Sequence, residues 1–123
     1  MIMTVEDLLK ILPGTVLTPQ LSLRREVKGG CAADLMSDVL ASVRAQALLL
    51  TGLCNIQVVR TAQMADVSAI VFVRGKQPSP ETIALAVEEN IPLLSTPLGM
   101  FELCGRLCQA GLPSSEDSLP QEP

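Results

Sequence analysis

The sequence predicts an α/β fold, a single three-layer domain in which helices cover a mainly parallel β-sheet. Segments 47–51, 68–73 and 91–96 are short and apolar at nearly every position, which is typical of strands buried on both faces of a parallel sheet. Segments with helical spacing of apolar residues alternate with these strands, as in α/β proteins. With 123 residues, 48% of them hydrophobic, the chain can form one self-sufficient core.

The N-terminal segment predicts a short amphipathic helix followed by a short strand. Thr4 and Asp7 form a near capping box at the start of a helix over residues 5–12. Pro13 and Gly14 end this helix. The sequence TVLT at 15–18 follows as a strand.

The next segment is charged and then rich in small residues. Residues 24–34 (RREVKGGCAAD) are expected to enter the sheet as an extended edge segment and to bend at Gly29-Gly30. Asp34 is expected to cap a helix over 35–45, whose apolar residues recur at helical spacing. The order of the strands in this half does not follow from the sequence.

The second half repeats a strand–helix unit. Gly52 and Gly75 end the first two apolar strands. Asn55, Ser79 and Thr96 are predicted N-caps, and Ser79 is followed by proline at the first helical position. The predicted helices span residues 56–65, 81–90 and 98–110. We therefore expect one domain over residues 1–112.

Residues 113–123 (PSSEDSLPQEP) are polar, acidic and rich in proline, so they are expected to form a disordered tail. The net charge of −4 argues against nucleic-acid binding, which needs a basic surface. The sequence has no apolar run long enough to span a membrane and no signal-peptide pattern at its start. These features predict a cytoplasmic protein with free thiols and no membrane association.

From Leu48 onward the order of elements resembles the DRTGG domain family. Ile91-Pro92-Leu93-Leu94-Ser95-Thr96 is similar to the closing signature of that family, and Pro78-Ser79-Pro80-Glu81 to the cap that precedes it. The segment 27–41 (VKGGCAADLMSDVLA) resembles the stand-alone branch, which is related to the N-terminal domain of HPr kinase. The resemblance implies a non-catalytic regulatory module that forms a homodimer and acts with a partner protein.

The residues that give the family its name are mostly replaced. Leu53 and Cys54 stand where the family has Asp-Arg, and Val73-Arg74-Gly75 stands where it has Thr-Gly-Gly. Only Gly75 matches. The fold expectation is independent of these positions, because it rests on the pattern of helices and strands.

The loops that follow parallel strands gather at one edge of the sheet, where ligands bind beside helix N-termini. If a small anionic or nucleotide ligand binds this chain, we expect it at this rim. The candidate rim residues are Thr51, Gly52, Asn55, Arg74, Gly75, Lys76, Ser95 and Thr96. The competing interpretation of Gly75-Lys76 is a tight turn with solvated cations, which we favour, because Ile70 and Gln77 occupy positions that a P-loop gives to Gly and Ser or Thr.

The four cysteines support an alternative function, a redox or iron–sulfur partner protein of an electron-transfer system. Cys104 and Cys108 are one helical turn apart, and Cys54 lies at a helix start, where the dipole lowers a thiol pKa. We favour Cys104 and Cys108 as packed core residues, since free cysteine packs as a small hydrophobe. The chain has no histidine, the commonest general base, and we expect neither an enzyme nor a bound cofactor or metal.

Overall fold

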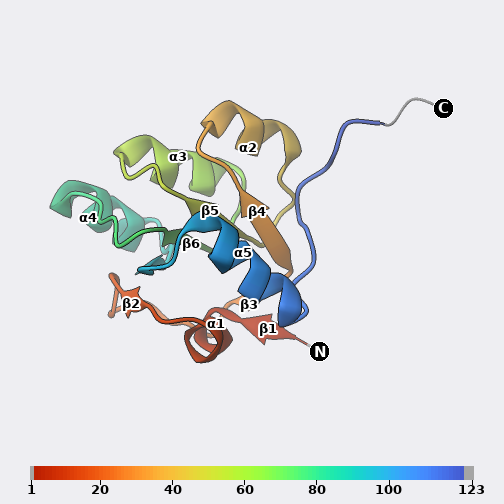
Figure 1. Cartoon of the computed structure of the whole chain (residues 1–123). Helices are drawn as coiled ribbons and strands as arrows, with labels where there is room; N and C mark the ends of the chain where they lie inside the picture. Colours follow the sequence, from red (N-terminus) through yellow and green to blue (C-terminus); the bar gives the residue numbers. More distant parts are fainter. Residues whose placement is uncertain (1, 121–123) are drawn as a thin grey trace.

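The five-stranded sheet is the centre of the fold in the computed structural model, which describes residues 2–120. Its strands are β2 (Thr15–Val16), β7 (Leu93–Ser95), β6 (Ala69–Phe72), β5 (Ala47–Thr51) and β4 (Gly29–Ala32), in that spatial order. The four strands from β4 to β7 are parallel, and β2 pairs antiparallel with β7 at the other edge. The mainly parallel sheet is therefore confirmed (Figure 1).

Two layers of helices enclose this sheet, as Figure 1 shows. The helices are α1 (Val5–Ile11), α2 (Met36–Ser42), α3 (Ile56–Met64), α4 (Pro80–Glu88) and α5 (Met100–Gln109). Right-handed crossovers that advance the sheet in one direction all fall on one face, so α2, α3 and α4 pack together there. The other face is covered by α1 and α5, beside a small antiparallel pair of β1 (Met3–Thr4) and β3 (Glu26–Val27).

The apolar strands contribute to both layers because successive side chains point to opposite faces. In β5, Leu48 and Leu50 pack in the layer of α1 and α5, whereas Leu49 packs against α2 and α3. These three side chains are all buried. This two-sided burial is the reason why the strand has no polar alternation in its sequence.

Of the five predicted helix caps, two are confirmed with their side-chain hydrogen bonds, one by position alone, and two are wrong. Thr4 and Asp7 form a complete capping box at α1, and Ser79 Oγ accepts the backbone N–H of Thr82 at α4. Asn55 is the N-cap of α3 but its side chain makes no capping hydrogen bond. The prediction for the last helix is wrong, since Gly99 rather than Thr96 is its N-cap.

Two expectations in the N-terminal half are wrong. Gly29 and Gly30 do not form a bend but begin β4, which pairs in parallel with β5. Asp34 does not cap α2, whose N-cap is Leu35 without a side-chain hydrogen bond. Its carboxylate instead reaches the end of β5, and this long-range partner is not visible in the local sequence.

Residues 113–117, which we call the C-terminal strap, lie along the edge strand β4. Gly30 N–H donates to Pro113 O at 2.8 Å, and Ser115 N–H donates to Gly30 O at 2.9 Å. Glu116 accepts the N–H of Ala32, and Arg44 and Asp117 form an ion pair. This differs from the expected disorder, because the unpaired edge of β4 offers the strap partners for its backbone; residues 121–123 of the expected tail lie outside the described residues.

Gly29 explains how the strap can approach so closely. A Cβ atom at this position would lie 2.2 Å from Ser115 Oγ and 2.8 Å from Pro113 O. Only glycine leaves room for the strap. Among residues 2–120, we find no helix with the length and apolar character that crossing a membrane requires.

Candidate functional site

The predicted rim residues come together at the C-terminal ends of β5, β6 and β7. Gly75 N–H donates to Thr96 O at 2.8 Å, and Ser95 Oγ donates to Lys76 O at 2.9 Å, so the second and third loops are joined. The Lys76 side chain also extends toward the first loop, because its Cε lies 3.7 Å from the position that a Cβ on Gly52 would take. The three strand-end loops therefore lie next to one another.

The polar groups at the end of β5 already bind an anion of the protein itself, the carboxylate of the exposed residue Asp34. Thr51 Oγ1 donates to Asp34 Oδ1 at 2.9 Å, and Gly52 N–H donates to the same oxygen at 2.8 Å. Thr51 Oγ1 in turn accepts the N–H of Leu53 at 3.1 Å. The buried hydroxyl of Thr51 and two backbone donors are thus satisfied within the protein. The sequence analysis missed Asp34 here, because its signal, an acid before an apolar helix, also fits a cap.

The end of β6 forms a tight turn, as the preferred interpretation of Gly75-Lys76 predicts. Arg74 and Gly75 have φ values of 57° and 68°, and Lys76 N–H donates to Val73 O at 3.1 Å. Left-handed backbone at both central positions is typical of a type I′ turn. Arg74 N–H also donates to Leu98 O at 2.8 Å, so the amides of this turn have protein partners.

The rim therefore divides into a buried part and an exposed part. The hydroxyl-bearing residues Ser95 and Thr96 are buried, and Thr96 Oγ1 donates to Pro13 O at 2.7 Å. Arg74, Lys76 and Asn55 are exposed. Neither of the two cations forms an ion pair with any residue in the described part of the chain. At Gly52, Leu53 and the turn 74–76, the groups that remain available to a ligand are therefore side chains rather than backbone amides.

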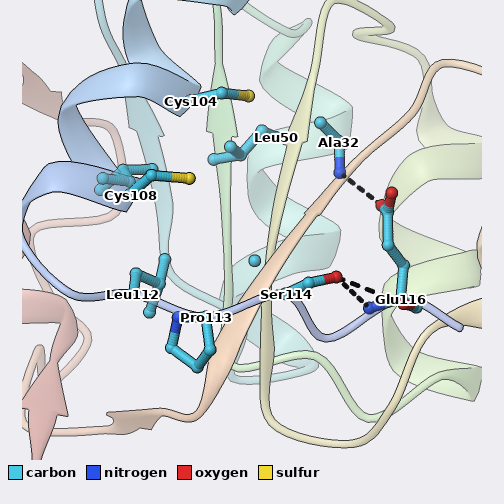
Figure 2. A pocket seen from close by; sticks show the side chains of 10 residues that line it. Ala32, Leu50, Cys104, Cys108, Leu112, Pro113, Ser114 and Glu116 are labelled. Atoms are coloured by element: carbon cyan, nitrogen blue, oxygen red, sulfur yellow. Dashed lines mark hydrogen bonds between the residues drawn. The ribbon is translucent and has the colours of Figure 1, made fainter.

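A separate cavity of about 170 Å³ lies between β4, α5 and the C-terminal strap (Figure 2). Its walls are mostly apolar, and two thiols and one carboxylate open onto it. The lining residues include Ala32, Leu50, Cys104, Leu107, Cys108, Leu112 and Glu116. Nothing in the sequence identified this cavity, because one of its walls is the strap that was expected to be disordered.

The four cysteines lie in three different environments. Cys31 is buried in the layer of α2 and α3, where burial and the neighbouring Glu116 raise its pKa to about 12. Burial also raises the pKa of Cys54, which outweighs the attraction of Lys76. The predicted lowering of this pKa by the helix dipole is therefore wrong.

The remaining two thiols, Cys104 and Cys108, belong to α5 and line the cavity. Burial raises the pKa of Cys104. Cys108 is exposed, so the expectation that both are core residues fails for Cys108. Within residues 2–120, no group of three or more His, Cys, Asp or Glu side chains is arranged to hold a metal ion.

Comparison with protein families gives one match. The DRTGG domain model matches residues 7–110, which is most of the chain. The chain belongs to the DRTGG domain family. The sequence-based assignment is confirmed, and it holds although the residues that name the family are mostly absent from this DRTGG domain.

A solved structure shows the same fold. This DRTGG domain is similar to the CBS and DRTGG domains of the regulatory region of Clostridium perfringens pyrophosphatase, solved in complex with the activator diadenosine tetraphosphate. The TM-score is 0.70 at 19% sequence identity, over 91% of this chain and 48% of the other. Our DRTGG domain thus spans about half the length of that chain. No curated protein matches it.

Proposed function

We propose that this DRTGG domain is a non-catalytic regulatory module that binds a small anionic ligand, such as a nucleotide, at the strand-end rim. The regulatory region that shares this fold over 48% of its chain was solved with a nucleotide activator, which supports a regulatory role. The observation that carries the location is the pair of exposed cations, Arg74 and Lys76, which both belong to the turn at the end of β6. Ligands of open parallel sheets bind at this edge.

The contacts in this proposal are side-chain contacts. The amides of Gly52, Leu53 and the Arg74–Lys76 turn already donate within the protein, so they do not form a phosphate cradle. Arginine and lysine side chains provide charge-assisted hydrogen bonds to phosphate oxygens. The exposed side-chain amide of Asn55, on the adjacent loop, adds an uncharged hydrogen-bond donor to these two cations. This arrangement favours a ligand with more than one negative charge.

The proposal is tested by isothermal titration of the full chain with a panel of ATP, ADP, AMP, diadenosine tetraphosphate and acetyl phosphate. We expect at least one of these compounds to bind and the Arg74→Ala/Lys76→Ala variant to lose this binding by at least about tenfold, since charge-assisted hydrogen bonds are lost. The matched control is Arg24→Ala/Lys28→Ala, which removes two exposed cations away from the rim and should leave binding unchanged. Absence of heat with every compound, or equal losses in both variants, would refute the rim as the site.

We also propose that the domain forms a homodimer. Large apolar side chains are exposed on adjacent helices, namely Leu35 and Leu40 at α2 and Ile56 at the start of α3. Exposed apolar surface of this kind is typical of protein interaction sites. Light scattering after size exclusion should give twice the chain mass of 13.1 kDa. A particle of single-chain mass at high protein concentration would refute self-association without affecting the ligand proposal.

A further inference from the structure

Cys104 and Cys108 form a pair of thiols on one side of α5. They lie on consecutive turns of the helix, and both line the cavity beneath the strap. Figure 2 shows both sulfur atoms directed away from the helix axis toward the cavity. Each is a free thiol. The pair is therefore open to a ligand that enters the cavity.

Core packing accounts for Cys104 only in part and does not account for Cys108. The buried side of α5 is provided by Leu103 and Leu107, which are 0% and 2% exposed. Cys104 is only partly buried beside them, and Cys108 is exposed. The two thiols thus lie at the margin of the core.

The spacing of the pair suits a bridging atom better than a direct disulfide. Side chains four residues apart on a helix have Cβ atoms about 5–6 Å apart. A disulfide requires Cβ atoms about 3.5–4.5 Å apart, so a direct bond between Cys104 and Cys108 would distort α5. An ion that binds both sulfur atoms spans this distance with the helix intact.

The donor set indicates the class of ion. Two thiolates are soft ligands, which select soft ions such as Cu(I). Structural zinc takes four protein ligands, whereas Cu(I) accepts two sulfur ligands. Ala32, Leu50 and Leu112 line the same cavity as the thiols, so the wall that faces the pair offers few competing polar ligands.

We propose that Cys104 and Cys108 form a two-thiolate binding site for a soft monovalent cation of the Cu(I) class. Binding replaces two S–H bonds by two metal–sulfur bonds and releases two protons to solvent. The oxidation state of the metal does not change. This site lies on α5 and is independent of the ligand proposed at the strand-end rim.

The test is an anaerobic competition titration of the reduced full chain with Cu(I) held by the chromogenic chelator bicinchoninate. We expect the wild-type chain to withdraw one Cu(I) per chain, and Cys104→Ser and Cys108→Ser each to weaken this binding by about 100-fold or more, because a metal ligand is lost. Cys54→Ser is the matched control and should bind as the wild type does. Zn(II) in equal amount should not displace the bound Cu(I).

The outcomes separate clearly. The proposal is overturned if the wild-type chain does not compete with the chelator, if Cys54→Ser weakens binding equally, or if either α5 variant binds Cu(I) as tightly as the wild-type chain. Because Cys108 is exposed, Cys108→Ser should fold normally. Its thermal unfolding and circular dichroism should match those of the wild-type chain, so loss of metal in this variant reports the site and not the fold.

Discussion

Replacement of Gly29 by alanine should release the C-terminal strap from β4. The added methyl group would lie 2.2 Å from Ser115 Oγ, 2.9 Å from Ser115 Cβ and 2.8 Å from Pro113 O. Two of these atoms belong to a short side chain and one to the backbone, so a rotamer change cannot relieve all the overlaps. The chain can avoid them by detaching the strap, and the cost of the substitution is then limited to the free energy with which the strap docks.

The size of this effect follows from the contacts that the strap makes. Four backbone hydrogen bonds of 2.8–2.9 Å join it to Gly30, Ser42 and Arg44, and Glu116 accepts one more from Ala32. A hydrogen bond contributes about 0.5–1.5 kcal/mol net, toward the low end where water can replace the partner. The strap also regains conformational freedom when it detaches. We therefore expect Gly29→Ala to lower the free energy of unfolding by about 1–2 kcal/mol.

Guanidinium denaturation of four proteins tests this reasoning: the wild-type chain, Gly29→Ala, a chain truncated after Leu112, and the truncated chain with Gly29→Ala. The substitution and the truncation should have similar effects, and Gly29→Ala should add little once the strap is gone. Gly30→Ala is the control, since its Cβ would meet only Leu112 Cδ2 at 3.4 Å. Additive losses in the double variant, or no loss in Gly29→Ala, would refute a docked strap that needs glycine.

Three further predictions concern single side chains. Asp34→Ala removes both hydrogen bonds at the end of β5 and should lower the free energy of unfolding by about 1–3 kcal/mol, measured by denaturation. The hydrogen bonds from Thr4 lower the pKa of Asp7 in the folded chain. The ionised Asp7 carboxylate therefore stabilises the fold above its ordinary pKa, and this stabilisation is lost as the pH falls through the lowered pKa. Thermal melts of Thr4→Ala should show a smaller loss of stability on acidification than melts of the wild-type chain. In alkylation at neutral pH followed by mass spectrometry, exposed Cys108 should react first, and buried Cys31, with its pKa of about 12, last.

Each of these has a control and a contradicting result. Asp38→Ala removes an exposed carboxylate of the adjacent helix and should leave stability unchanged; an equal loss would contradict the role of Asp34. Equal acid sensitivity in Thr4→Ala and wild type would show that the Thr4 hydroxyl does not contribute to the lowered pKa of Asp7, whose hydrogen bond from the backbone N–H of residue 4 is retained in this variant. Alkylation of Cys31 as fast as that of Cys108 would contradict its burial, and denatured protein should label at all four thiols alike.

Where the sequence prediction failed, the cause was a partner distant in the chain. Asp34 precedes a helix and has the residue type of a cap. Its carboxylate oxygen instead accepts hydrogen bonds from the Thr51 hydroxyl and the Gly52 N–H. Thr96 likewise donates its hydroxyl hydrogen bond to Pro13 O, 83 residues away, and Gly99 is the N-cap of α5. Local propensity is a weak prior that tertiary contacts can override.

The candidate sites show the same division. The rim could be predicted from the sequence, since strand ends and glycine turns place loops at one edge of a parallel sheet. The sequence could not predict which rim groups remain free to bind a ligand. That depends on the carboxylate of Asp34 and on the contacts of Arg74 and Gly75 with the third loop. The cavity lined by Cys104 and Cys108 could not be predicted from the sequence, since its walls come from β4, α5 and the strap, which are far apart in the chain.

The sequence by itself determined the parallel sheet, its helical layers and the family, because these depend on the period of apolar residues and on turn residues close together in the chain. The expected edge segment is confirmed as β4, but only the tertiary structure decided that Gly29 and Gly30 belong to it, that the strap covers its edge, and which polar groups stay free. The physical reason is that backbone edges and side-chain oxygens bond to whichever donor the fold brings near, and a local pattern does not specify that donor.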